Sequence, residues 1–178
     1  MVTRIGIVAG EILELLDQRN GVLVYGEFHS TLKESRDLAL MGLGWLLHAG
    51  YVHIIEDPFR TIYQDNDRKK AYTSAAFMFD LVVGNNVAGA SGKRIKDIPN
   101  HMSDVADKIL NLLEGCGDLV DLRTIECNVN EHRVIVLMSL GWLIREKHVS
   151  VTAADQELFV FQLSKEKEGL KIESFSHV

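Results

Sequence analysis

Two stretches of the chain carry the same order of apolar and polar positions. At the start of each stretch, apolar residues recur at intervals of three and four, which is the spacing of a helix with one buried face. The positions are Val8, Ile12, Leu15 and Leu16 in the first stretch and Val105, Ile109, Leu112 and Leu113 in the second. The pattern predicts an amphipathic helix at the head of each stretch.

Short elements are predicted behind each of these helices. Apolar runs at 22–24 and 119–120 are long enough for one short strand each. Short helices are expected over roughly 26–32 and 123–129. Each stretch therefore begins in the order helix, strand, helix.

A long apolar helix comes next in both stretches. Two matching pairs are typical of a capped helix start, in which a side-chain oxygen accepts an unsatisfied backbone N–H. The pairs are Thr31 with Glu34 and Asn128 with Glu131. We expect both long helices to begin at these residues and to end near His48 and Glu146.

Alternating, β-branched segments follow the long helices and predict strands. In the second stretch, residues 148–163 have the pattern of a hairpin with a turn at 153–156. In the first stretch, a strand at 51–55 finds its best return strand only at 76–83, after a long insertion at about 56–74. The first hairpin is therefore interrupted.

The two stretches align without a gap. The motif Leu43-Gly44-Trp45-Leu46 recurs as Leu140-Gly141-Trp142-Leu143, and at this offset of 97 residues 8–55 align on 105–152 with 15 identities in 48 positions. Such repetition indicates an internal duplication. It predicts one unit at 1–83, a glycine-rich linker at 84–100, a second unit at 101–165 and a charged tail at 166–178.

Helix, strand, helix, helix, hairpin is the order of the winged helix-turn-helix unit. Both stretches, and above all the Leu-Gly-Trp-Leu motif in the long helix followed by a strand, resemble a small and functionally uncharacterised bacterial winged-helix family. The resemblance covers about 48 residues of each half and the second hairpin. It implies an α+β fold of two tandem winged-helix units and a DNA-binding ancestry. It supplies no catalytic residues and no ligand.

A winged helix that binds DNA places the N-terminal half of its third helix in the major groove, and basic flanks hold phosphate. The nucleic-acid candidates are Lys33, Ser35 and Arg36 in the first unit, Asn130, His132 and Arg133 in the second, and Arg68, Lys69 and Lys70 in the insertion. The same helical turns also carry acidic residues. For Arg36 and Arg133 we prefer a surface ion pair, or a side-chain stem packed along apolar surface, to a phosphate contact.

Charge gives DNA binding no general support. The chain has 19 Lys and Arg against 25 Asp and Glu, a net charge of −6. Residues 1–83 hold 8 basic and 11 acidic residues and residues 84–178 hold 11 and 14, so each half carries −3. The positive field expected of a nucleic-acid-binding domain is missing.

The long helices are apolar on more than one side, which predicts a second covered face. Glycine inside a helix costs about 1 kcal/mol relative to alanine, and close approach of another helix is the usual compensation. Gly44 and Gly141 occupy such positions. This second face is covered by other elements of the same unit, by the other unit or by a partner subunit. The interface candidates are Met41, Trp45, Val134, Met138 and Trp142.

Two functions follow. The first is a DNA-associated or transcription-related protein with duplex DNA as its partner. The alternative is a protein-interaction or self-association module that uses the apolar faces of the long helices without binding DNA. We expect no catalysis, cofactor or metal, because the seven histidines are scattered and Cys116 and Cys127 have no ligand spacing. We also expect a cytoplasmic protein without a membrane span.

Overall fold

The computed structural model describes residues 2–19, 21–24, 31–55, 82–85, 97–117, 119–155 and 158–164. The first half of this part of the chain contains α1 (Val2–Gln18), β1 (Val22–Val24), α3 (Arg36–His48), β2 (Val52–Ile55) and β3 (Val82–Asn85). The second half contains α6 (Asp97–Cys116), β4 (Val120–Asp121), α7 (Leu122–Val129), α8 (Arg133–Arg145), β5 (Val149–Asp155) and β6 (Leu158–Leu163). Helices combined with small antiparallel sheets make this an α+β fold.

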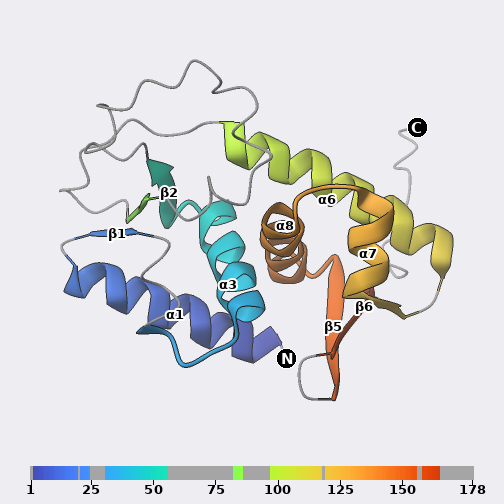
Figure 1. Ribbon diagram of the computed structural model, residues 1–178, viewed down its shortest axis with the longest axis horizontal. Helices are drawn as coiled ribbons and strands as arrows, with labels where there is room; N and C mark the ends of the chain where they lie inside the picture. The colour runs from blue at the N-terminus through green and yellow to red at the C-terminus, as the bar shows by residue number, and fades with distance from the viewer. Residues whose placement is uncertain are drawn as a thin grey trace, which may run out of the picture.

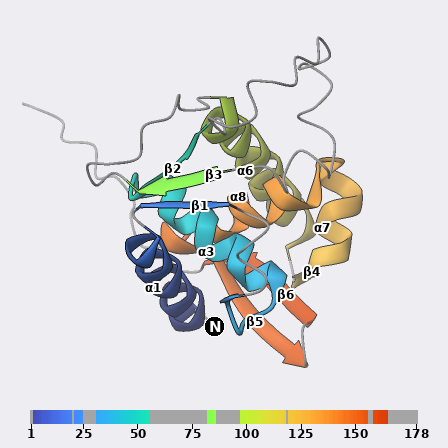
Figure 2. The ribbon, with the colours of Figure 1, turned by 60° about the vertical axis from the view of Figure 1, so that its left-hand side comes forward.

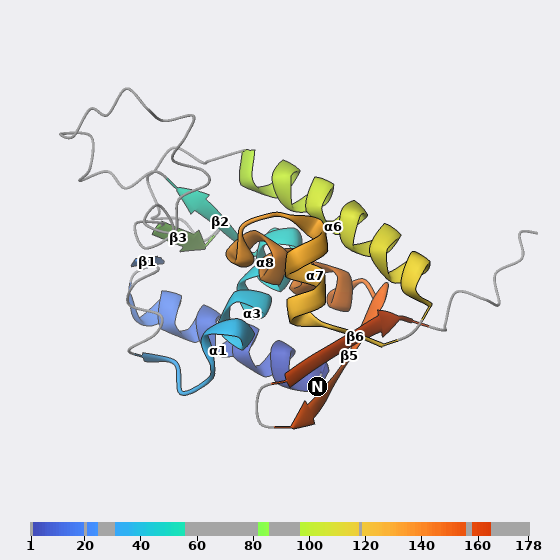
Figure 3. The same ribbon diagram turned by 45° about the vertical axis from the view of Figure 1, so that its right-hand side comes forward.

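The long helices occupy the centre of the molecule. α3 and α8 lie side by side, α1 packs on the outer side of α3, and α6 packs on the outer side of α8 (Figure 1). The two sheets lie at opposite ends of this helical layer (Figure 3). The core is therefore continuous between the halves.

The predicted amphipathic helices are confirmed. In α1 the side chains of Val8, Ile12 and Leu16 are completely buried, and α6 buries its apolar stripe in the same way. α6 begins at Asp97, four residues before the predicted start of the second unit. Pro99 lies in its first turn, where a missing N–H removes no helical hydrogen bond.

Each half has one three-stranded antiparallel sheet with the last strand in the middle. The order is β1-β3-β2 in the first sheet (Figure 2) and β4-β6-β5 in the second. In the second sheet, Phe161 pairs with Val120 on one side and Val151 on the other, and its side chain is fully buried. The predicted hairpin at 148–163 is confirmed, but the prediction of a turn at 153–156 was wrong, because residues 153–155 are the end of β5, which pairs with β6. β4 begins one residue later than expected.

The prediction of a linker at 84–100 was wrong at both ends. Gly84 and Asn85 belong to β3, where Gly84 pairs with Val22 and His53. Pairing with a strand on each side holds Gly84 in an extended conformation. The glycine-rich composition that suggested a linker contains no information about this pairing. Residues 97–100 belong to α6. The remaining linker residues 86–96, the insertion at 56–74 and the tail at 166–178 lie outside the described residues.

Two predictions fall partly on residues that the structure leaves undescribed. Of the predicted return strand at 76–83, only its last two residues are described, and both lie in β3. The short helix predicted at 123–129 is observed as α7, whereas its counterpart at 26–32 lies mostly outside the described residues.

The N-caps of the long helices lie four residues after the predicted caps. Ser35 caps α3 by accepting a hydrogen bond from the backbone N–H of Leu38, and Nδ1 of His132 accepts one from the N–H of Val134 at the start of α8. Asn128 lies inside α7, which ends where Asn130 adopts a left-handed conformation with φ 52°. The chain must leave α7 before α8 begins, so Asn128 cannot cap α8.

Candidate functional site

Two glycines bring α3 and α8 into backbone contact. A Cβ atom at Gly44 would lie 1.9 Å from the carbonyl oxygen of Met138, and a Cβ atom at Gly141 would lie 1.9 Å from that of Met41. The two contacts are equivalent under the repeat, because Gly141 lies 97 residues after Gly44 and Met138 lies 97 residues after Met41. The close approach predicted from these glycines is confirmed.

This contact covers the second apolar face of each long helix. Met41 and Met138 have no exposed surface. All residues of 38–47 and 134–144 are buried apart from Trp45 and Trp142, which are half-buried. The sequence left open whether the same unit, the other unit or a partner subunit covers this second face. The structure shows that the other half of the same chain covers it.

The two helices cross at the glycines (Figure 1), and contacts join their equivalent ends on either side of the crossing. Near their N-terminal ends, an Nη atom of Arg133 lies 2.6 Å from a carboxylate oxygen of Asp37. At their C-terminal ends, the ring of His48 stacks on Trp142 with 4.4 Å between the ring centroids. Equivalent ends of the two long helices therefore contact each other.

His48 lies between the halves in a polar setting. Its Nε2 is 3.3 Å from Oε1 of Glu146, and its side chain is 34% exposed. Burial lowers the pKa of His48 below its ordinary value of 6.5, and the positive charges of Arg145 and His148 act in the same direction against the opposing effect of Glu146.

The nucleic-acid candidates gather near the N-terminal ends of α3 and α8, but several serve the fold. Ser35 and His132 are helix caps, and Asn130 ends α7. Lys33 and Arg36 are exposed at the start of α3. The remaining candidates, Arg68, Lys69 and Lys70, lie outside the described residues.

Arg133 forms ion pairs with acids from both halves. It contacts Glu126 of α7 and Asp37 of α3, and 48% of its side chain is exposed. This matches the surface ion pair preferred for Arg133 from the sequence. The guanidinium thus joins the second half to the first at the rim of the α3–α8 contact.

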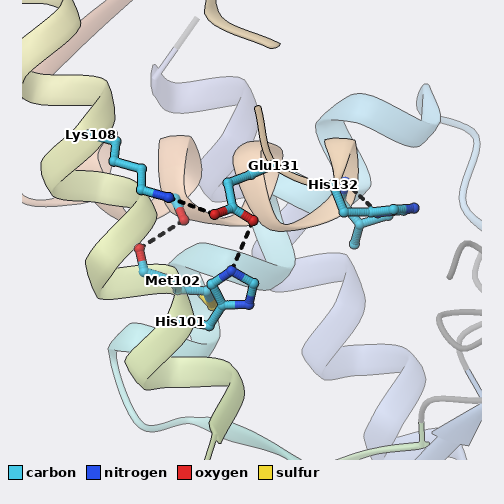
Figure 4. A network of polar contacts seen from close by, with 7 residues as sticks. His101, Met102, Lys108, Glu131 and His132 are labelled. Carbon is cyan, nitrogen blue, oxygen red and sulfur yellow. Dashed lines mark hydrogen bonds and ion pairs between the residues drawn. The ribbon is translucent and has the colours of Figure 1, made fainter. Parts of the chain in front are cut away.

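A polar network next to this rim was not found from the sequence (Figure 4). Glu131 accepts a hydrogen bond from Nζ of Lys108 at 2.6 Å, and its other oxygen lies 3.0 Å from Nε2 of His101. Burial disfavours the charged carboxylate, but the hydrogen bonds and charges of Lys108 and His101 together outweigh it and hold the pKa of Glu131 below its ordinary value.

The first half has a counterpart of this network. Arg4 of α1 forms an ion pair with Glu34, with 2.5 Å between Nη2 and Oε2. Arg4 and His101 are 97 residues apart, as are Glu34 and Glu131. Extending the repeat four residues toward the N-terminus would have paired these residues.

The interface candidates are taken up within the chain. Met41 and Met138 form the backbone crossing, and Trp142 stacks on His48 of the other half. The ring of Trp45 lies over Gly6 of α1, 3.9 Å from the position of a Cβ atom there. Val134 is buried with 2% exposed. Within the described ranges, these side chains join elements of one chain.

The described residues provide no metal-binding constellation. No group of three or more histidine, cysteine, aspartate or glutamate side chains among them is placed to hold a metal ion. Cys116 and Cys127 are exposed and form no disulfide bond. None of the described helices combines the length and apolar composition needed to span a membrane. No family model, curated protein or solved structure matches this chain significantly.

Proposed function

We propose that the chain is an internal duplication of the winged-helix unit and acts as a non-catalytic protein-interaction module. Three observations support the duplication. Each half has a long first helix, a three-stranded sheet with its last strand in the middle, and a long helix before the last two strands. α8 begins and ends 97 residues after α3. Gly44 and Gly141 make reciprocal contacts with the opposite long helix.

The mutual burial of α3 and α8 carries the functional proposal. A winged-helix dimer that reads DNA places its two third helices in major grooves about 34 Å apart. Here the corresponding helices touch through their backbones at Gly44 and Gly141, and both are buried along most of their length. This geometry disfavours readout of bases by these helices, so we place the protein-interaction module first.

Ion pairing supports the same choice. Arg4, Lys108 and Arg133 all lie near the N-terminal ends of the long helices, where phosphate contacts were expected. Their partners are Glu34 for Arg4, Glu131 for Lys108, and Asp37 with Glu126 for Arg133. A DNA phosphate would have to replace these carboxylates, which weakens the electrostatic gain on which nucleic-acid binding depends.

The partner surface lies outside the contact between the long helices. Ile7 on α1, Tyr51 before β2 and Leu119 before β4 are large apolar side chains that are 57%, 56% and 58% exposed. They provide positions for a photo-reactive amino acid in living cells. We expect a partner protein to be captured from at least one of them and not from the buried Met41.

Reconstitution completes the test. The captured protein, purified separately, should form a stoichiometric complex with the unmodified chain, measured by light scattering after gel filtration. The proposal is wrong if no captured protein binds in purified form and the chain instead binds duplex DNA.

DNA association is the second candidate, favoured by the run Arg68-Lys69-Lys70 and by the family resemblance. It would use phosphate contacts rather than base readout. In that case binding to arbitrary duplex DNA weakens steeply with salt and is reduced when the three residues are changed to glutamine. Under the leading proposal, wild type and variant are equally indifferent to duplex DNA at low salt.

A further inference from the structure

His48 lies where a change in its charge acts on the contact between the halves. Its ring stacks on Trp142 of the opposite helix with 23° between the planes, and its Nε2 faces Glu146 at the end of that helix. An uncharged imidazole fits this position well. It offers an apolar ring face to the indole and a ring nitrogen to the carboxylate.

The surroundings provide little compensation for a positive charge on His48. The oxygen of Glu146 that faces His48 is also 2.9 Å from an Nη atom of Arg145. This carboxylate is already paired with a permanent cation. His148 contributes a second imidazole nearby. Protonation of His48 therefore adds a cation beside Arg145 and His148, and among the charged side chains of the described ranges it is Glu146 that offsets this repulsion.

We propose that protonation of His48 loosens the contact between the C-terminal ends of α3 and α8, so that mild acidification weakens the association of the two halves. The lowered pKa of His48 agrees with this, since the folded chain favours the neutral imidazole. At pH values above the ordinary value of 6.5 the contact is at full strength. It weakens as the pH falls through the lower value that holds in the folded chain.

The repeat shows that the device belongs to one half. The residue 97 positions after His48 is Arg145, and the residue 97 positions after Ala49 is Glu146. The position that holds a permanent cation in one half thus holds a titratable group in the other. Arg145, the equivalent residue of the second half, keeps its charge between about pH 5 and about pH 8, where histidine titrates.

Amide hydrogen exchange of the full chain tests the proposal. We expect protection of the last turns of α3 and α8, corrected for intrinsic rates, to be lost between about pH 7.5 and about pH 5.5 in the wild type. In His48→Gln the loss should be absent. The control His148→Gln, which removes the neighbouring imidazole, should retain it.

A second variant guards against loosening by the substitution itself. His48→Phe keeps an aromatic ring on Trp142 but cannot be protonated, so it should be protected equally at both pH values. Histidine NMR signals, with His48 assigned from the variant, should titrate below 6.5. The inference is overturned if protection is equal or greater in acid, if the loss persists in both variants, or if His48 titrates above 6.5.

Discussion

Gly44 lies against the peptide unit of Met138 so closely that a Cβ atom in its place would be 1.9 Å from the carbonyl oxygen. The backbone of α3 itself is the contact surface at this point. The same relation recurs between Gly141 and Met41. Each glycine costs its helix about 1 kcal/mol relative to alanine. The approach of the two helices, which buries both methionines completely, offsets that cost.

Gly44→Ala should destabilise the chain by about 3 kcal/mol or more. The new methyl group meets backbone atoms of Met138, which cannot rotate away, so the two helices must separate. Urea unfolding followed by circular dichroism measures the change. Gly141→Ala should have an effect of similar size because its contact with Met41 is equally close.

Gly10→Ala is the matched control for this prediction. Gly10 also lies inside a helix, but a Cβ atom there meets nothing within 4 Å. The substitution should stabilise the chain by about 0.5–1 kcal/mol through helix propensity alone. Equal effects of the substitutions at Gly10 and Gly44 would contradict the close contact of α3 and α8.

The ion pair between Arg133 and Asp37 should contribute little to stability. Although it joins the two halves, 48% of the arginine side chain is exposed, and exposed pairs typically contribute less than about 1 kcal/mol. A double-mutant cycle with Arg133→Met and Asp37→Asn isolates this pair from that with Glu126. The coupling should shrink as salt is added, and a large coupling that is insensitive to salt would contradict the prediction.

Periodicity and repetition were sufficient to predict most of the described elements. The apolar stripe of α1, the ends of the long helices near His48 and Glu146, and the hairpin at 148–163 all follow from local pattern. The helix starts did not, because Thr31 and Ser35 are both suitable caps and lie only four residues apart. Tertiary contacts decide between them, and a linear pattern does not contain those contacts.

The candidate site was predictable only in outline. Gly44 and Gly141 correctly indicated close approach, but amphipathicity does not specify which apolar surface meets which. The pairing of Glu131 with Lys108 and His101 joins residues that are 23 and 30 positions apart. Neither separation is a helical period. Only the comparison with Arg4 and Glu34 at the repeat offset gives a sequence signal for it.

Ser139→Ala should destabilise the chain by about 1 kcal/mol. The hydroxyl of Ser139 is fully buried and donates a hydrogen bond to the carbonyl oxygen of Met102 in α6 at 2.9 Å. The equivalent position in the first half is Gly42, where a Cβ atom would lie 3.2 Å from the backbone nitrogen of Ala9. Space for a serine therefore exists between α6 and α8 and is tighter between α1 and α3. Urea unfolding that shows no loss for Ser139→Ala would contradict this role.

Glu131 should make stability fall in acid. Its pKa lies below the ordinary value of 4.5, because the hydrogen bonds from Lys108 and His101 outweigh the cost of its burial. A carboxyl group with a lowered pKa in the folded chain stabilises it above the unfolded value and loses that contribution as the pH falls through the folded value. The free energy of unfolding should therefore decrease below about pH 4.5.

The decrease should be smaller in Glu131→Gln, which cannot ionise, than in the wild type. Glu114→Gln removes one negative charge at an exposed position of α6 and serves as the control, with the wild-type slope expected. Urea unfolding across this pH range measures all three proteins. Parallel curves for the wild type and Glu131→Gln would show that the network with Lys108 and His101 does not favour the charged carboxylate.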